Sequence, residues 1–151
     1  MRPPIHFACC SSAVRLAQVA STAQGRHLPA GPARRLALGV ATARIGLGVV
    51  AAIAPTVVAR PWIGEEAHGP GAKVLGRALG GRDLALGLGP VLAARRGAPI
   101  RGWVEAAVLA DLVDTGATLI AFRRLPRRGR WLVLASAGGA AAAGALAARS
   151  L

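Results

Sequence analysis

Six charged side chains inside long apolar segments are the residues of this sequence best placed to do chemistry. They are three arginines and three aspartates, namely Arg44, Arg77, Arg82, Asp83, Asp111 and Asp114. An unpaired charge in hydrocarbon costs about 2.5–3.5 kcal/mol on insertion scales, so such residues are expected to pair. The six charges sum to zero, which favours an ion-pair network that fixes helix register. A proton or ion path, or a polar pocket, is the competing interpretation.

Counting residues along the segments predicts which of these charges meet. Arg77 and Asp114 are displaced toward the same side of the apolar layer, so they are expected to pair. Arg82 is level with Asp111, and Arg44 can reach Asp111 or the aspartate that follows Arg82. Asp111 and Asp114 are three residues apart, so both lie on one helix face, which should look at the second segment.

The elements that must position these charges are four apolar segments, at about residues 36–59, 72–94, 100–122 and 131–148. The first contains one charge and the last none, and each is long enough to cross a hydrocarbon layer of about 30 Å. The middle two qualify as spans only if their charges are buried. The sequence therefore predicts an all-α fold, a four-helix transmembrane bundle of up-down topology. Pro55 lies near the end of the first segment and can kink it.

Tryptophans lie at the ends of these segments. Trp62 follows the first segment, Trp103 opens the third and Trp131 opens the fourth. Tryptophan is enriched where a membrane meets water, so these residues are expected to be interface anchors. In an up-down bundle Trp62 and Trp131 fall on one side, and Trp103 on the other.

Composition supports a lipid environment. Hydrophobic residues make up 54% of the 151 residues and charged residues 17%, which excludes an intrinsically disordered chain. The formal charge of +13 invites a nucleic-acid interpretation, but the arginines are scattered between apolar blocks. A soluble bundle would need a polar face on the fourth segment, which offers only Ser136. We expect a lipid bilayer as partner, no nucleic acid, and the plasma membrane of a prokaryote as location.

Residues 1–35 differ from the rest of the chain. This stretch holds both cysteines and several prolines and lacks a long apolar run. It is expected to be an extension that is disordered or weakly helical. Isolated histidines and the adjacent cysteines offer no metal-ligand spacing, so no metal, cofactor or catalytic group is expected.

Glycine spacing indicates close helix packing. Gly76 and Gly80 are four residues apart, and Gly87 follows on nearly the same face of the second segment. Small residues let membrane helices approach each other, within one chain or between chains. A homo-oligomer or another membrane protein is therefore a possible partner.

The motifs resemble a known family. The run Gly81-Arg82-Asp83-Leu84-Ala85-Leu86-Gly87-Leu88-Gly89, preceded by Arg44 and followed by Asp111 and Asp114, is similar to the small four-helix membrane proteins grouped as DUF4267, a domain of unknown function. The resemblance covers about residues 36–148. It implies a polytopic membrane protein and supplies no activity.

Three functions remain open from the sequence. The favoured one is a non-enzymatic structural or assembly component with a buried Arg/Asp network. The alternative is a small proton- or ion-coupled transporter that uses the intramembrane carboxylates. A basic soluble nucleic-acid binder is the least favoured.

Overall fold

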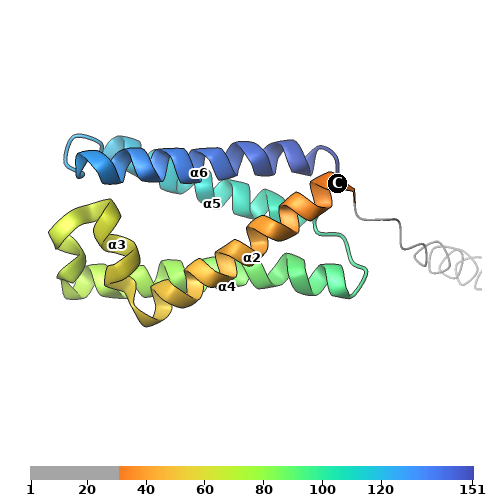
Figure 1. The fold of residues 1–151 in the computed structure, drawn as a ribbon, viewed down its shortest axis with the longest axis horizontal. Helices are drawn as coiled ribbons and strands as arrows, with labels where there is room; N and C mark the ends of the chain where they lie inside the picture. The colour runs from red at the N-terminus through yellow and green to blue at the C-terminus, as the bar shows by residue number, and fades with distance from the viewer. Residues whose placement is uncertain (1–30) are drawn as a thin grey trace, which may run out of the picture.

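The computed structural model describes residues 31–151, and this part of the chain is all-helical, as predicted. Its helices are α2 (Pro32–Ile53), α3 (Pro55–Ile63), α4 (Pro70–Arg95), α5 (Arg101–Ile120) and α6 (Arg127–Ala148), with a 3-10 helix, η2 (Gly64–His68). The four long helices run along the long axis in alternating directions, and α3 lies at one end (Figure 1). Both α2 and α6 are long and apolar enough to cross a membrane.

Proline sets where several helices begin. Pro32, Pro55 and Pro70 each occupy the first turn, where a missing N–H breaks no helical hydrogen bond. Helix α2 therefore begins inside the predicted extension, and the prediction was wrong for residues 32–35. The rest of that prediction falls on residues 1–30, outside the described part. Helix α6 begins at Arg127, one turn earlier than expected.

The first apolar segment is two helices rather than one. Proline disfavours helical geometry at the residue before it, and Ala54 has φ −127° and ψ 65°. Helix α3 starts at Pro55 and packs across the end of the molecule against α4 and α6. A continuous helix over 36–59 was therefore a wrong prediction, because Pro55 ends α2 and does not merely bend it.

Helices α2 and α4 pack with their backbones close together. A Cβ atom placed on Gly80 would lie 2.8 Å from the backbone nitrogen of Ala52. One placed on Gly87 would lie 2.6 Å from the carbonyl oxygen of Ala41, and one on Gly48 would lie 2.7 Å from the carbonyl oxygen of Gly80. Glycine at these positions lets the helix surfaces meet without side chains between them.

Replacing Gly87 with alanine is expected to destabilise the protein by about 1–3 kcal/mol, because the new methyl group would collide with the α2 backbone. Gly81→Ala is the matched control on the same helix, since a Cβ atom there meets nothing within 4 Å. Thermal denaturation in detergent should show a lower Tm for Gly87→Ala and an unchanged or higher Tm for Gly81→Ala. Equal Tm values for the two variants would contradict the close approach of α2 and α4.

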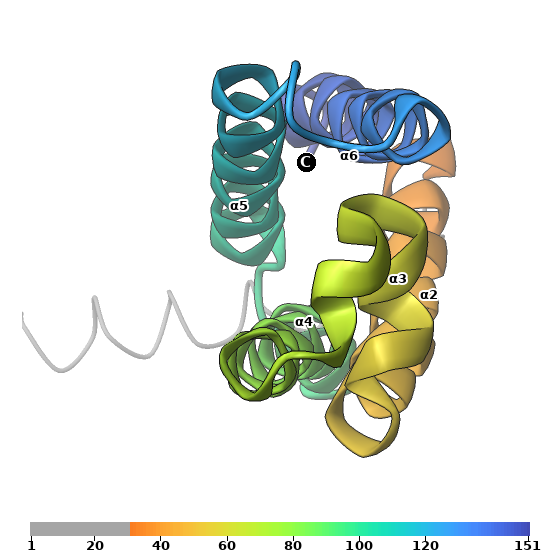
Figure 2. The same ribbon diagram turned by 90° about the vertical axis from the view of Figure 1, so that its left-hand side faces the viewer.

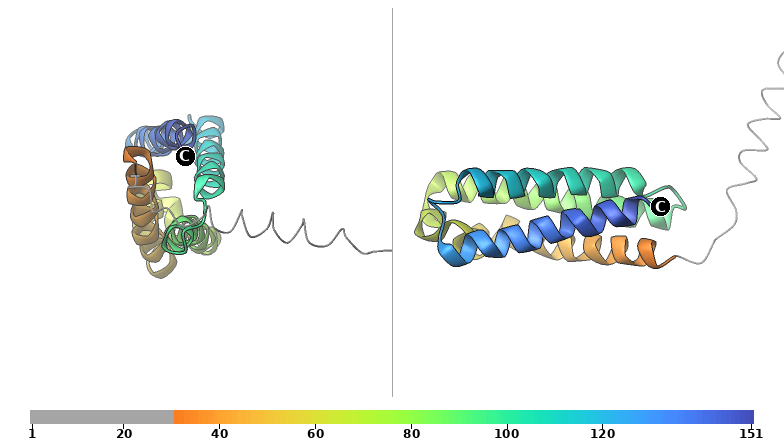
Figure 3. Two further views of the ribbon diagram at one scale, coloured as in Figure 1. Left: turned by 90° about the vertical axis from the view of Figure 1, so that its right-hand side faces the viewer. Right: turned by 90° about the horizontal axis from the view of Figure 1, so that it is seen from above.

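Viewed along the long axis, the four long helices are arranged around the centre of the molecule (Figure 2, and Figure 3, left). The most extensive helix contacts are between α2 and α4 and between α5 and α6, so the bundle consists of two helix pairs. A small apolar cluster joins the pairs at the end opposite α3, and it contains Ala37, Ile100, Val104 and Ala148. Most other buried residues are alanines and glycines, together with the polar or charged Arg44, Asp83, Asp111 and Thr118.

Candidate functional site

Arg44 lies at the centre of a buried group of charges. This side chain projects from α2, and the residue is 9% exposed. Its Nη1 donates to Asp83 Oδ1 on α4 at 2.9 Å, and its Nη2 donates to Asp111 Oδ2 on α5. One guanidinium therefore links three helices. Arg44 is expected from the sequence to reach Asp111 or Asp83, and in the structure it contacts both.

Arg82 makes the second set of ion pairs. Its Nη1 and Nη2 donate to Asp114 Oδ1 and Oδ2 at 3.0 Å and 2.7 Å, a two-pronged contact between α4 and α5. Nη2 also lies 3.5 Å from Asp83 Oδ1. Planar guanidinium and carboxylate groups match well in this geometry, which makes it stronger than a single hydrogen bond.

One predicted pairing is wrong. Arg77 is exposed and takes part in none of the ion pairs of residues 31–151, so it does not reach Asp114. Arg82, which residue counting places level with Asp111, contacts Asp114 instead. The structure thus brings five of the six predicted residues together and leaves Arg77 on the outside of α4.

Helix geometry positions the carboxylates. Asp83 lies between Gly80 and Gly87 on the α4 face that packs against α2, which places it opposite Arg44. Asp111 and Asp114 are one turn apart on α5. The hydroxyl groups of Thr115 and Thr118 donate to the backbone carbonyls of these two aspartates at 2.7 Å. Both hydroxyls are therefore already engaged within α5.

Without Arg77 the group of charges does not balance. Two guanidinium groups face three carboxylates, so the group carries a charge of −1 when every member is ionised. The charges alternate along the order Asp111, Arg44, Asp83, Arg82, Asp114. Both ends of this order are carboxylates on the same helix. We call these five residues the charge chain.

A cavity of about 680 Å³, open to the outside of the bundle, lies beside the charge chain, between the two helix pairs. All five charged residues line it, and the rest of its wall is mostly apolar, from α2, α3, α4 and α6. Toward α3 the wall includes Pro55, Val58 and Trp62. Sequence reasoning did not find this cavity, because it depends on how far the helix pairs stand apart.

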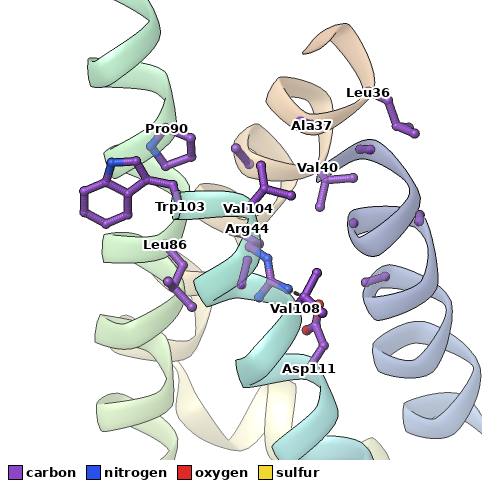
Figure 4. Close-up of a pocket in the computed structure, with 16 residues that line it drawn as sticks. Leu36, Ala37, Val40, Arg44, Leu86, Pro90, Trp103, Val104, Val108 and Asp111 are labelled. Carbon is purple, nitrogen blue, oxygen red and sulfur yellow. Dashed lines mark hydrogen bonds and ion pairs between the residues drawn. The ribbon is translucent and has the colours of Figure 1, made fainter. Parts of the chain in front are cut away.

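A second, smaller pocket of about 30 Å³ lies toward the opposite end. Figure 4 shows Arg44 and Asp111 side by side among apolar side chains that include Val104, Val108 and Trp103. Both residues line the small pocket and the cavity. The Arg44–Asp111 ion pair therefore forms part of the wall between the two.

The tryptophans lie near the two ends of the bundle, as expected. Trp62 and Trp131 lie at the α3 end, and Trp103 lies near the start of α5 at the other end. Trp131 packs edge-on against Phe122 with ring centroids 5.4 Å apart, and the Arg130 guanidinium lies 4.3 Å from the Phe122 centroid. Arg130 also donates to the Phe122 carbonyl at 2.9 Å. Phe122, Arg130 and Trp131 thus form a cluster of aromatic and cationic side chains that was not predicted from the sequence.

Residues 31–151 contain no group of three or more histidine, cysteine, aspartate or glutamate side chains arranged to hold a metal ion. Comparisons with protein-family models, curated proteins and solved structures give no match for this chain.

Proposed function

We propose that this chain is a small integral membrane protein in which four helices cross the bilayer and the charge chain holds the two helix pairs together. The observation that carries the proposal is that large apolar side chains are exposed whereas charged and polar side chains are buried. Ile120 is 91% exposed and Ile53 is 75% exposed, whereas Asp111 is 5% and Thr118 0% exposed. Water would disfavour this arrangement, since exposed apolar patches of this extent are rare on soluble monomers. Lipid favours it.

The proposal includes α4 and α5, although hydropathy alone does not mark them as spans. On α4 the stretch between Arg77 and Arg95 has no outward charge, because Arg82 and Asp83 face inward. On α5 the same is true between Glu105 and Arg123. Each stretch is 17 residues long. The α4 stretch is helical throughout, which corresponds to about 25 Å, and the α5 stretch is helical up to Ile120, which corresponds to about 22 Å. A stretch shorter than the hydrocarbon layer of about 30 Å is accommodated by local thinning of the bilayer and by flanking arginine side chains that extend to the interface.

Charged side chains at both ends support this placement. They are split between the two ends of the bundle rather than gathered on one face, as a nucleic-acid surface would require. One end carries Arg34, Arg35, Arg95, Arg96, Arg101 and Arg149, and the α3 end carries Arg60, Lys73, Arg123, Arg124, Arg127 and Arg128. Trp62, Trp103 and Trp131 lie near these ends, where we assign them as interface anchors.

The charge chain fits a structural role. Helices α4 and α5 share few other contacts, and the Arg82–Asp114 and Arg44–Asp111 ion pairs bridge the space between the helix pairs. We also propose a relationship to DUF4267. Its support is that Arg44, the Arg82-Asp83 pair, Asp111 and Asp114 are the residues that meet in the interior.

Membrane fractionation tests the proposal. A tagged full-length chain expressed in bacteria should stay in the membrane pellet after washing at alkaline pH with sodium carbonate, and a mild detergent should release it. Release of most of the protein by the carbonate wash alone would contradict membrane integration.

Ion-coupled transport is the second candidate, and a specific observation favours it. The charge chain lacks one positive charge, and all three of its carboxylates line the cavity. A purely structural network in lipid is expected to be neutral, because residual charge is costly there.

A further inference from the structure

The alternation of positive and negative groups in the charge chain is broken between its two end carboxylates, Asp111 and Asp114. Along Asp111, Arg44, Asp83, Arg82 and Asp114 each neighbour has the opposite sign, and the contacts are direct. Between the two ends, Asp111 and Asp114, no positive group of residues 31–151 intervenes. These carboxylates are one helical turn apart on α5, a spacing at which like charges repel. One positive charge placed between them would close the alternation and neutralise the group.

The interrupted place is open to the cavity. Asp111 and Asp114 both line the space of about 680 Å³, and the Asp114 side chain is the most exposed carboxylate of the charge chain, at 20%. Most of the wall beyond them is apolar and includes Leu47, Val58 and Leu132. A small inorganic cation would contact the carboxylates but not the apolar wall. A molecule with one positive charge and an apolar body would contact both the carboxylates and the apolar wall.

We propose that the cavity binds a monovalent hydrophobic organic cation, with its positive group next to Asp111 and Asp114 and its apolar body toward α3. The inference rests on the membrane placement proposed above, because the low dielectric of lipid makes one uncompensated charge strongly attractive. Burial of the apolar body adds about 25 cal/mol per Å² removed from water.

Other features of the site agree with a ligand that carries a single positive charge. Calcium binds six to eight oxygen ligands, and the carboxylates here are mostly engaged by arginine. The Nε atoms of Arg44 and Arg82 donate to no acceptor within residues 31–151, but protein atoms cover them. A ligand in the cavity therefore meets the excess carboxylate charge rather than these donors.

Equilibrium dialysis of the full chain in lipid nanodiscs tests the proposal, with tetraphenylphosphonium as the permanently charged probe and empty nanodiscs as the blank. We expect saturable binding of one probe per chain and at least about tenfold weaker binding to Asp114→Asn, which neutralises the excess charge. Arg77→Gln is the matched control outside the charge chain and should bind as the wild type does. The neutral triphenylphosphine oxide should show no saturable binding.

A compensating variant separates charge from folding. Arg82→Gln combined with Asp114→Asn loses the same ion pair as Asp114→Asn but restores the charge of −1. It should bind the probe within about threefold of the wild type. The proposal is overturned if the wild type shows no saturable binding, if Asp114→Asn binds equally well, or if the double variant stays as weak as Asp114→Asn. A wild type that resists the carbonate wash but does not bind overturns this inference alone.

Discussion

Replacing Arg44 with glutamine should lower the free energy of unfolding by about 3–5 kcal/mol, the largest effect expected from any single substitution in the charge chain. The guanidinium is the common partner of Asp83 and Asp111, so its loss leaves two buried carboxylates short of a counter-charge. Unfolding of the protein in mild detergent by titration with SDS, followed by tryptophan fluorescence, measures this loss.

Two further variants define the cause of that loss. Arg77→Gln removes an exposed arginine that forms no ion pair within residues 31–151, and it should change the free energy of unfolding by less than about 0.5 kcal/mol. The triple variant Arg44→Gln, Asp83→Asn, Asp111→Asn should be more stable than Arg44→Gln alone, because it removes the stranded charges as well. If Arg44→Gln remained within 1 kcal/mol of the wild type, the ion pairs would not hold the helix pairs together.

The Arg82–Asp114 ion pair should show a coupling energy of about 1–3 kcal/mol in a double-mutant cycle built from Arg82→Gln and Asp114→Asn. The reason is the two-pronged contact at 3.0 Å and 2.7 Å between helices that share few other contacts. The effect is expected to be smaller than that of Arg44, since these side chains are 29% and 20% exposed and line the cavity, so they are less completely buried. The same SDS titration provides all four stabilities.

The control cycle uses a pair that does not touch and is not connected through the charge chain. Arg77 with Asp114 should give a coupling energy below about 0.5 kcal/mol. A cycle in which Arg77 couples to Asp114 more strongly than Arg82 does would restore the pairing that residue counting predicts and contradict the observed one.

That difference shows what the sequence can and cannot predict about the site. Depth follows from counting residues at about 1.5 Å each, and it correctly puts charges from three helices at similar levels. Rotation does not follow from counting depth. Arg77 and Arg82 are five residues apart, which separates them by about 140° around α4, so both cannot face α5. Which flank of α4 faces α5 depends on how the helix pairs assemble.

The end of the first apolar segment illustrates a second limit. Pro55 is visible in the sequence, but a proline in an apolar segment is compatible with a kink or with a full break. Tertiary packing decides between them. Gly76 and Gly129 have no side chain to keep α3 away, and a Cβ atom on Gly129 would collide with the backbone of Pro61 and Trp62. These two distant glycines permit α3 to fold across the end of the bundle.

The cavity could not be predicted, for a related reason. Composition and spacing predict which faces are apolar, but the distance between the helix pairs depends on the long side chains that bridge them. Arg44 and Arg82 bridge these pairs through Asp111 and Asp114 on α5. The charge imbalance follows from the exposed position of Arg77 on α4, which counting residues does not predict.

The most direct test of the membrane placement is the environment of the outward face of α5, one of the two proposed spans that hydropathy alone does not mark. Nitroxide spin labels at Leu109 and Val113, and at Arg124 as a water-exposed control, would be introduced in a chain with Cys9→Ser and Cys10→Ser, reconstituted in lipid. Power-saturation electron paramagnetic resonance then compares collision with oxygen, which concentrates in lipid, and with a water-soluble nickel chelate. The account predicts high oxygen and low nickel accessibility at Leu109 and Val113, and the reverse at Arg124. Nickel accessibility at Leu109 and Val113 equal to that at Arg124 would contradict it.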